Sequence, residues 1–151
     1  MQIDYQITGT GWAAAAISHQ ESRAELGASY LTDALGDLVA AATLALSTEE
    51  EIRFSWELEP GEHRWILTPA DGLLRVQILS FRDMDDHQDD EDGRETFGCE
   101  VSAPEFAEAV LRGAEHVQGE LGLERYREQW VEHDFPQGAV DELGKLLDQR
   151  R

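Results

Sequence analysis

The sequence predicts a single α+β domain in which an antiparallel sheet is covered by helices mainly on one face. Alternating apolar and polar residues, the period of a half-buried strand, are grouped near the start of the chain and again between residues 52 and 101. Apolar residues at helical spacing occupy the segments between and after these groups. Strands and helices that are grouped, and do not alternate one by one, favour α+β over a parallel α/β sheet. The length of 151 residues, without an internal repeat, fits one domain, residues 1–151.

The N-terminal segment predicts a β-hairpin. Ile3, Tyr5 and Ile7 alternate with polar residues, as on a strand with one wet face. Residues 9–11 (Gly-Thr-Gly) supply the backbone freedom that a tight turn needs. Residues 12–19 then return as the second strand, although their alanines have low strand propensity.

The first helix is expected after a polar connection, residues 20–27. Apolar residues recur at helical spacing over residues 31–42, and Ser29 is placed to cap the helix. Gly36 inside the helix indicates close packing, which we expect to be against the sheet.

The clearest pattern is an antiparallel meander. Residues 52–59 alternate strictly, and the Pro-Gly pair at 60–61 is a turn signal. Residues 64–68 form a second strand, and after another turn residues 73–81 form a third. The third strand is apolar on both faces, which predicts a central position in the sheet.

An acidic stretch separates this meander from a fourth strand, residues 96–101. Seven acidic residues fall between Asp83 and Asp92. Like charges at this density repel one another, so the sequence predicts a flexible loop over residues 83–95.

The C-terminal third predicts helices only. Ser102 is a capping residue at the start of the first of them, and Gly122 is expected to end or bend it. A second helix covers residues 123–130, residues 134–136 break it, and a last helix surrounds residues 140–147. The expected order is β-β-α-β-β-β-β-α-α-α.

Composition excludes several classes of protein. The chain has 32 acidic and 12 basic residues and a formal net charge of −20. Its single lysine and scattered arginines do not form the basic patch that nucleic acid or an anionic membrane requires. The sequence shows neither an apolar run near the roughly 18 residues of a membrane span nor the pattern of a signal peptide. One cysteine fits a reducing compartment, so we expect a cytoplasmic protein.

No motif for catalysis, a metal or a cofactor emerges. When Gly93 is aligned as the sixth residue of a calcium loop, the twelfth is Cys99 and not the required Glu. The five histidines are dispersed, and zinc-ligand and nucleophile-elbow spacings are absent. Cys99 alternates with apolar residues, which predicts a small core residue. We therefore expect no cofactor, and a protein that is more readily a binder than an enzyme.

In length, charge and strand–helix order the chain resembles small acidic immunity-type proteins of bacterial toxin systems. These are cytosolic α+β domains that block a toxin's active surface, often that of a basic nuclease. The resemblance implies a non-catalytic protein that engages a basic protein partner through an acidic surface. The candidate contributors are the acids beside the meander and in the loop: Glu57, Glu59, Glu62, Asp85, Asp86, Asp89, Asp90 and Asp92.

Two alternatives stay open at the level of sequence. The protein could bind or transform a small molecule in a pocket between sheet and helices. The surplus of acid could also be a solubility or salt adaptation without a partner.

Overall fold

The computed structural model describes residues 1–83 and 88–150, and within them it has three α-helices and two antiparallel sheets. The predicted α+β class is confirmed. The strands are divided between an N-terminal sheet and a C-terminal sheet, where one sheet was expected.

The N-terminal sheet has three strands and not the predicted two. The strands β1 (Gln2–Gly9), β2 (Trp12–His19) and β3 (Ser22–Ser29) pair in sequence order. The prediction of a polar connection over residues 20–27 is therefore wrong. In β3 small or apolar side chains do alternate with polar ones, and Leu26 is buried, but alanines and a glycine give that alternation little contrast.

Helix α1 (Ala34–Ala45) starts later than predicted. Its cap is Asp33, whose Oδ1 accepts the N–H of Gly36 at 3.2 Å. Ser29 instead ends β3, and its hydroxyl donates to the carbonyl of Glu57 at 2.9 Å. At Gly36, where packing against a sheet was expected, the nearest atoms belong to the helix cap. A Cβ at this position would lie 2.1 Å from the capping carboxylate, so the close approach is to the cap.

The C-terminal sheet confirms the predicted meander. Its strands are β4 (Ile52–Glu57), β5 (Glu62–Ala70), β6 (Leu73–Phe81) and β7 (Arg94–Val101), paired in that order. Strand β6 lies between two neighbours, as its two apolar faces predicted.

The acidic loop is shorter than predicted. Residues 94–95 belong to β7, and a single 3₁₀ turn, Asp90–Asp92, precedes that strand. Two of the candidate acids, Asp85 and Asp86, lie outside the described residues.

Two helices complete the chain, α2 (Ala103–Trp130) and α3 (Gln137–Gln149). Ser102 caps α2 as predicted, accepting the N–H of Glu105 at 3.2 Å. The expected bend is found at Gly122, where φ is +75°, so the segments predicted as two helices are two arms of α2.

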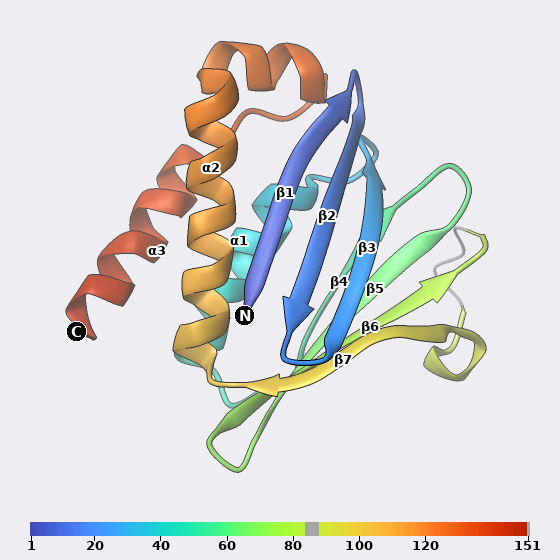
Figure 1. Ribbon diagram of the computed structural model, residues 1–151, viewed down its shortest axis with the longest axis vertical. Helices are drawn as coiled ribbons and strands as arrows, with labels where there is room; N and C mark the ends of the chain where they lie inside the picture. Colours follow the sequence, from blue (N-terminus) through green and yellow to red (C-terminus); the bar gives the residue numbers. More distant parts are fainter. Residues whose placement is uncertain (84–87, 151) are drawn as a thin grey trace.

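The two sheets curve around α1, and α2 lies along the edge strand β1 (Figure 1). Helix α3 packs on the outside of α1 and α2. Each sheet has an inner face turned to this helical layer and an outer face turned away. The inner faces carry the aromatic core, which includes Trp56 and Trp65, whose ring centroids lie 5.1 Å apart. The indole N–H of Trp56 donates to the carbonyl of Ala34 at 3.0 Å and so ties the C-terminal sheet to α1.

The close contact of α2 with β1 depends on one glycine. A Cβ on Gly113 would lie 2.8 Å from the carbonyl oxygen of Ile3, a backbone atom that cannot move freely. We expect Gly113→Ala to lower the free energy of unfolding by about 1–3 kcal/mol. Gly119→Ala is the matched control on the same helix, because a Cβ there meets nothing within 4 Å. It should raise stability by about 0.5–1 kcal/mol. Urea unfolding measures both, and equal effects would contradict the packing described.

His63 makes stability depend on pH. It lies on the inner face of the C-terminal sheet, its Nδ1 2.7 Å from the hydroxyl of Ser80, and burial lowers its pKa from 6.5 to about 4. Below pH 6.5 the His63 imidazole is protonated in the unfolded chain, whereas in the folded protein it stays neutral down to about pH 4. The free energy of unfolding therefore falls as pH drops from 6.5 to 4. Between pH 7.5 and 5, His63→Gln should lose less stability than the wild type, by roughly 2 kcal/mol in urea unfolding. Parallel losses in the two proteins would contradict this role.

Candidate functional site

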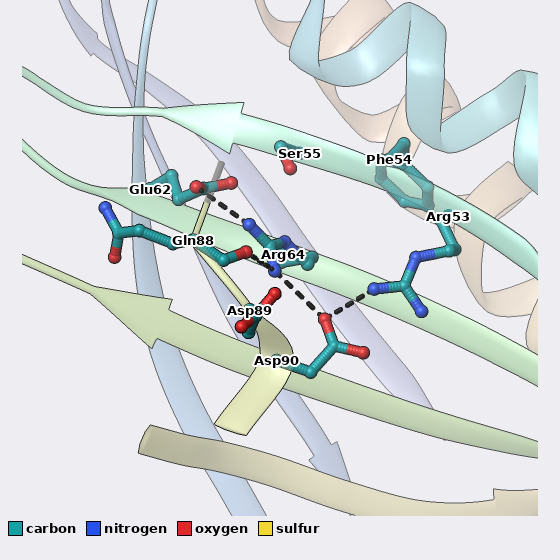
Figure 2. A pocket seen from close by; sticks show the side chains of 8 residues that line it. All are labelled: Arg53, Phe54, Ser55, Glu62, Arg64, Gln88, Asp89 and Asp90. Atoms are coloured by element: carbon teal, nitrogen blue, oxygen red, sulfur yellow. Dashed lines mark hydrogen bonds and ion pairs between the residues drawn. The ribbon is translucent and has the colours of Figure 1, made fainter. Parts of the chain in front are cut away.

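A surface hollow of about 430 Å³ lies on the outer face of the C-terminal sheet (Figure 2). Its walls come from β4, from β5 and from residues 88–92, which we call the acidic segment. Strand alternation explains why charged side chains gather here. Arg53 and Ser55 alternate with the inner-face aromatics of β4, and Ser55 pairs in register with Arg64 of β5.

Arg64 is the centre of the charged groups. Only 11% of its side chain is exposed. Its Nη1 donates to Asp90 Oδ1 and to the carbonyl of Gln88, both at 2.9 Å. Its Nη2 lies 3.3 Å from Oε1 of Glu62, a carboxylate that is 7% exposed. The guanidinium carbon also lies 4.4 Å from the centroid of the Phe81 ring, a cation–π distance.

Arg53 reaches the same carboxylate oxygen from the neighbouring strand. Its Nη2 lies 2.5 Å from Asp90 Oδ1, and its Nη1 lies 2.8 Å from Oε1 of Glu51. Figure 2 shows the two guanidinium groups converging on Asp90. The hydrogen bond from Arg53, reinforced by that from Arg64, lowers the pKa of Asp90 against the opposing effect of burial. Asp90 is therefore a charged link between two strands and the acidic segment.

A small apolar cluster lies under this network. Ile66, Leu79 and Phe81 are buried on the outer face, separate from the main core. Gly93 follows the acidic segment, and a Cβ there would lie 2.6 Å from a carbon of the Phe81 ring. The backbone at Gly93 therefore packs directly against the Phe81 ring. The acidic segment is held to the sheet both by this apolar contact and by the ion pairs of Asp90.

The structure assigns different environments to the acids proposed from the sequence. Glu62, Asp89 and Asp90 line one hollow, but Glu62 and Asp90 are paired with arginine. Asp89 and Asp92 are exposed. Glu57 is half-buried at the end of β4, and Glu59 is exposed in the turn that follows.

The arginines were missed by sequence reasoning. Arg53 could be assigned to the polar face of a strand, and Arg64 to the adjoining strand. Their convergence on one carboxylate depends on the register of β4 and β5 and on the return of the chain at Asp90, which no periodicity reveals.

The groups gathered at this hollow are charged side chains. Within the part of the chain that the structure describes, no group of three or more His, Cys, Asp or Glu side chains is arranged to hold a metal ion. Burial raises the pKa of the Cys99 thiol to about 11, which keeps it protonated at neutral pH. By contrast, the arginine pairs neutralise Glu62 and Asp90, whereas Asp89 of the lining and the neighbouring Glu91 and Asp92 are exposed.

Comparison of the chain with protein-family models, with curated proteins and with solved structures found no match. Among the described helices, none is both long and apolar enough to cross a membrane. The charged outer face of the C-terminal sheet is thus the feature that carries a functional proposal.

Arg64 should contribute strongly to stability. In Arg64→Met the carboxylate of Glu62 stays buried without its counter-charge, which should lower the free energy of unfolding by about 3 kcal/mol. The double variant E62Q/R64M should recover part of this loss, because no unpaired charge is left inside. Arg53→Met is the matched control: this side chain is 42% exposed, so its removal should change stability by less than about 1 kcal/mol. Urea unfolding distinguishes the variants, and equal effects of R64M and R53M would contradict the network.

Proposed function

We propose that this chain is a non-catalytic binding protein, of the immunity type, that engages a basic protein partner through the outer face of its C-terminal sheet. The observation that carries the proposal is the attachment of the acidic segment to the sheet. Arg53 and Arg64 hold Asp90, so the neighbouring exposed carboxylates of Asp89, Glu91 and Asp92 occupy a defined position beside the hollow.

Fixed carboxylates favour such a partner for two reasons. Opposite charge steers a basic protein to the surface and disfavours an anionic one. A segment that is already held in place also loses less conformational entropy on binding than a mobile loop would. Carboxylates outnumber guanidinium groups around the hollow, because Glu51, Glu62 and Asp90 already exceed the two arginines by one before the three exposed acids are counted.

The alternative of a small-molecule site between the sheets and the helices has less support. Large side chains fill that space, among them Tyr5, Trp56, Trp65, Tyr126 and Trp130, all at most 1% exposed. A solubilising coat is the second alternative. It differs from the proposal in one expectation: if the acids are only a solubilising coat, removing any exposed acid should weaken binding of a basic protein by the same amount.

The test compares two triple variants of equal charge change. D89N/E91Q/D92N removes the exposed acids of the segment and leaves Asp90 in its ion pairs. E115Q/E124Q/E128Q removes three exposed acids from α2. The wild-type protein is immobilised, and a basic protein from a lysate of the source cells is captured at low salt, identified and purified. Calorimetry then gives its Kd for each variant at 50 and 300 mM NaCl.

We expect the segment variant to weaken binding by about tenfold and the α2 variant by less than threefold. Binding of the wild type should fall steeply with salt, because exposed charges are screened. Equal effects of the two variants would favour a solubilising coat. Capture of no basic protein would contradict the proposal.

A further inference from the structure

One of the four tryptophans is set apart from the others. Trp56, Trp65 and Trp130 are 0% exposed, whereas Trp12 is 41% exposed. Trp12 opens β2 and lies on the outer face of the N-terminal sheet, because its neighbour Ala13 is buried on the inner face. The hydrophobic effect would favour burial of so large a ring, and exposed tryptophan is the side chain most enriched at binding hot spots.

The surroundings of Trp12 allow close approach by another molecule. Along the same face of β2 the next side chains are those of Ala14 and Ala16, so the face beside the ring is low. Gly27 lies opposite Ala14 in β3, and the side chain of Leu58 covers it, so the low part of the face is along β2 at Ala14 and Ala16. In Figure 1 the three strands of this sheet lie in front of α1, and no helix covers the face turned to the viewer.

One exposed acidic residue, Glu59, lies in the turn after β4, which borders this face. Trp12 pairs in register with Ser29, and the Ser29 hydroxyl donates to the carbonyl of Glu57 at 2.9 Å. Leu58 lies against the outer face at Gly27, where an added Cβ would be 3.1 Å from Leu58 Cδ2. Trp12 and the β4–β5 turn are therefore neighbours across the end of β3, and the exposed Glu59 belongs to that turn.

This combination fits a cation. The face of a tryptophan ring attracts a guanidinium or ammonium group, and arginine is the more frequent partner because its plane also stacks on the ring. The carboxylate of Glu59 in the neighbouring turn adds attraction for the same group and repels an anion. An apolar partner alone would gain nothing from the acidic border.

We propose that Trp12 anchors the partner, by receiving an arginine side chain on its indole ring beside the acidic β4–β5 turn. This rests on the proposed function, since the arginine belongs to the same basic protein. It adds a contact on the N-terminal sheet that the acidic segment does not supply.

The test uses hexa-arginine peptide as the probe. Three tryptophans are buried, so collisional quenching of fluorescence by acrylamide reports chiefly on Trp12. Saturating peptide at low salt should reduce the wild-type quenching constant at least twofold. Trp12→Ala should weaken binding of labelled peptide by about fivefold, and Trp12→Phe, which keeps an aromatic face, by less. Leu44→Ala is the control, because Leu44 is an exposed apolar residue on α1. This variant should bind the labelled peptide with the affinity of the wild type.

The outcomes separate the two proposals. Peptide that binds in a salt-dependent way, with unchanged quenching and with equal affinity for wild type and W12A, would overturn the role of Trp12 and leave the acidic-surface function standing. Failure of the peptide to bind the wild-type protein even at low salt would overturn both. The quenching measurement needs no variant, so a folding defect in W12A does not remove the test.

Discussion

The burial of Arg64 between two carboxylates is the interaction on which the charged outer face of the C-terminal sheet depends. Its guanidinium joins Glu62 on its own strand to Asp90 of the acidic segment, and it lies over the ring of Phe81. A guanidinium group that is so little exposed is tolerated only when its N–H groups donate hydrogen bonds to acceptors in the protein. The same contacts that satisfy Arg64 therefore hold a densely acidic stretch against a sheet in spite of its own repulsion.

This arrangement gives the two faces of the C-terminal sheet different tasks. The inner face carries aromatic side chains into the core, where Trp56 and Trp65 contact each other and the start of α1. The outer face carries the arginines and a separate apolar cluster under the chain at Gly93. The period of two along β4 and β5 produces both faces from one stretch of sequence. Aromatic packing on the inner side thus supports a charged surface on the outer side.

Sequence patterns could predict the elements whose chemical contrast is strong. The strict alternation of residues 52–59, the turn at 60–61 and the apolar third strand gave the meander correctly. Strand β3 escaped because alanine and glycine make a faint alternation, and helix α1 was started too early because Ser29 and Asp33 are both capping residues. Only tertiary contacts, with β2 and with Glu57, decide between the alternatives.

The candidate site shows the same limit more sharply. Composition pointed to the acids, and their residue type was sufficient to suggest charge recognition. Periodicity could not say that Glu62 and Asp90 are neutralised by arginine, because the convergence of Arg53 and Arg64 needs the register of two strands and the path of the returning chain. The exposed position of Trp12 could not be decided from the sequence for a related reason. Four alanines follow Trp12 along β2 and give little information about which face is buried, and the turn that lies beside it in space is more than forty residues later in the chain.

Amide hydrogen exchange of the acidic segment tests the central claim most directly. The N–H groups of Asp92 and Gly93 bond to the carbonyls of Asp89 and Asp90 in the 3₁₀ turn, at 3.0 and 3.1 Å. If the arginines hold this turn on the sheet, Asp90→Asn should speed exchange of these amides by about tenfold, since a neutral amide replaces the charge-assisted bonds. Asp89→Asn, which removes an exposed carboxylate one residue earlier, should leave exchange unchanged. Equal exchange in wild type and D90N would show that the segment stays in place without its arginine contacts.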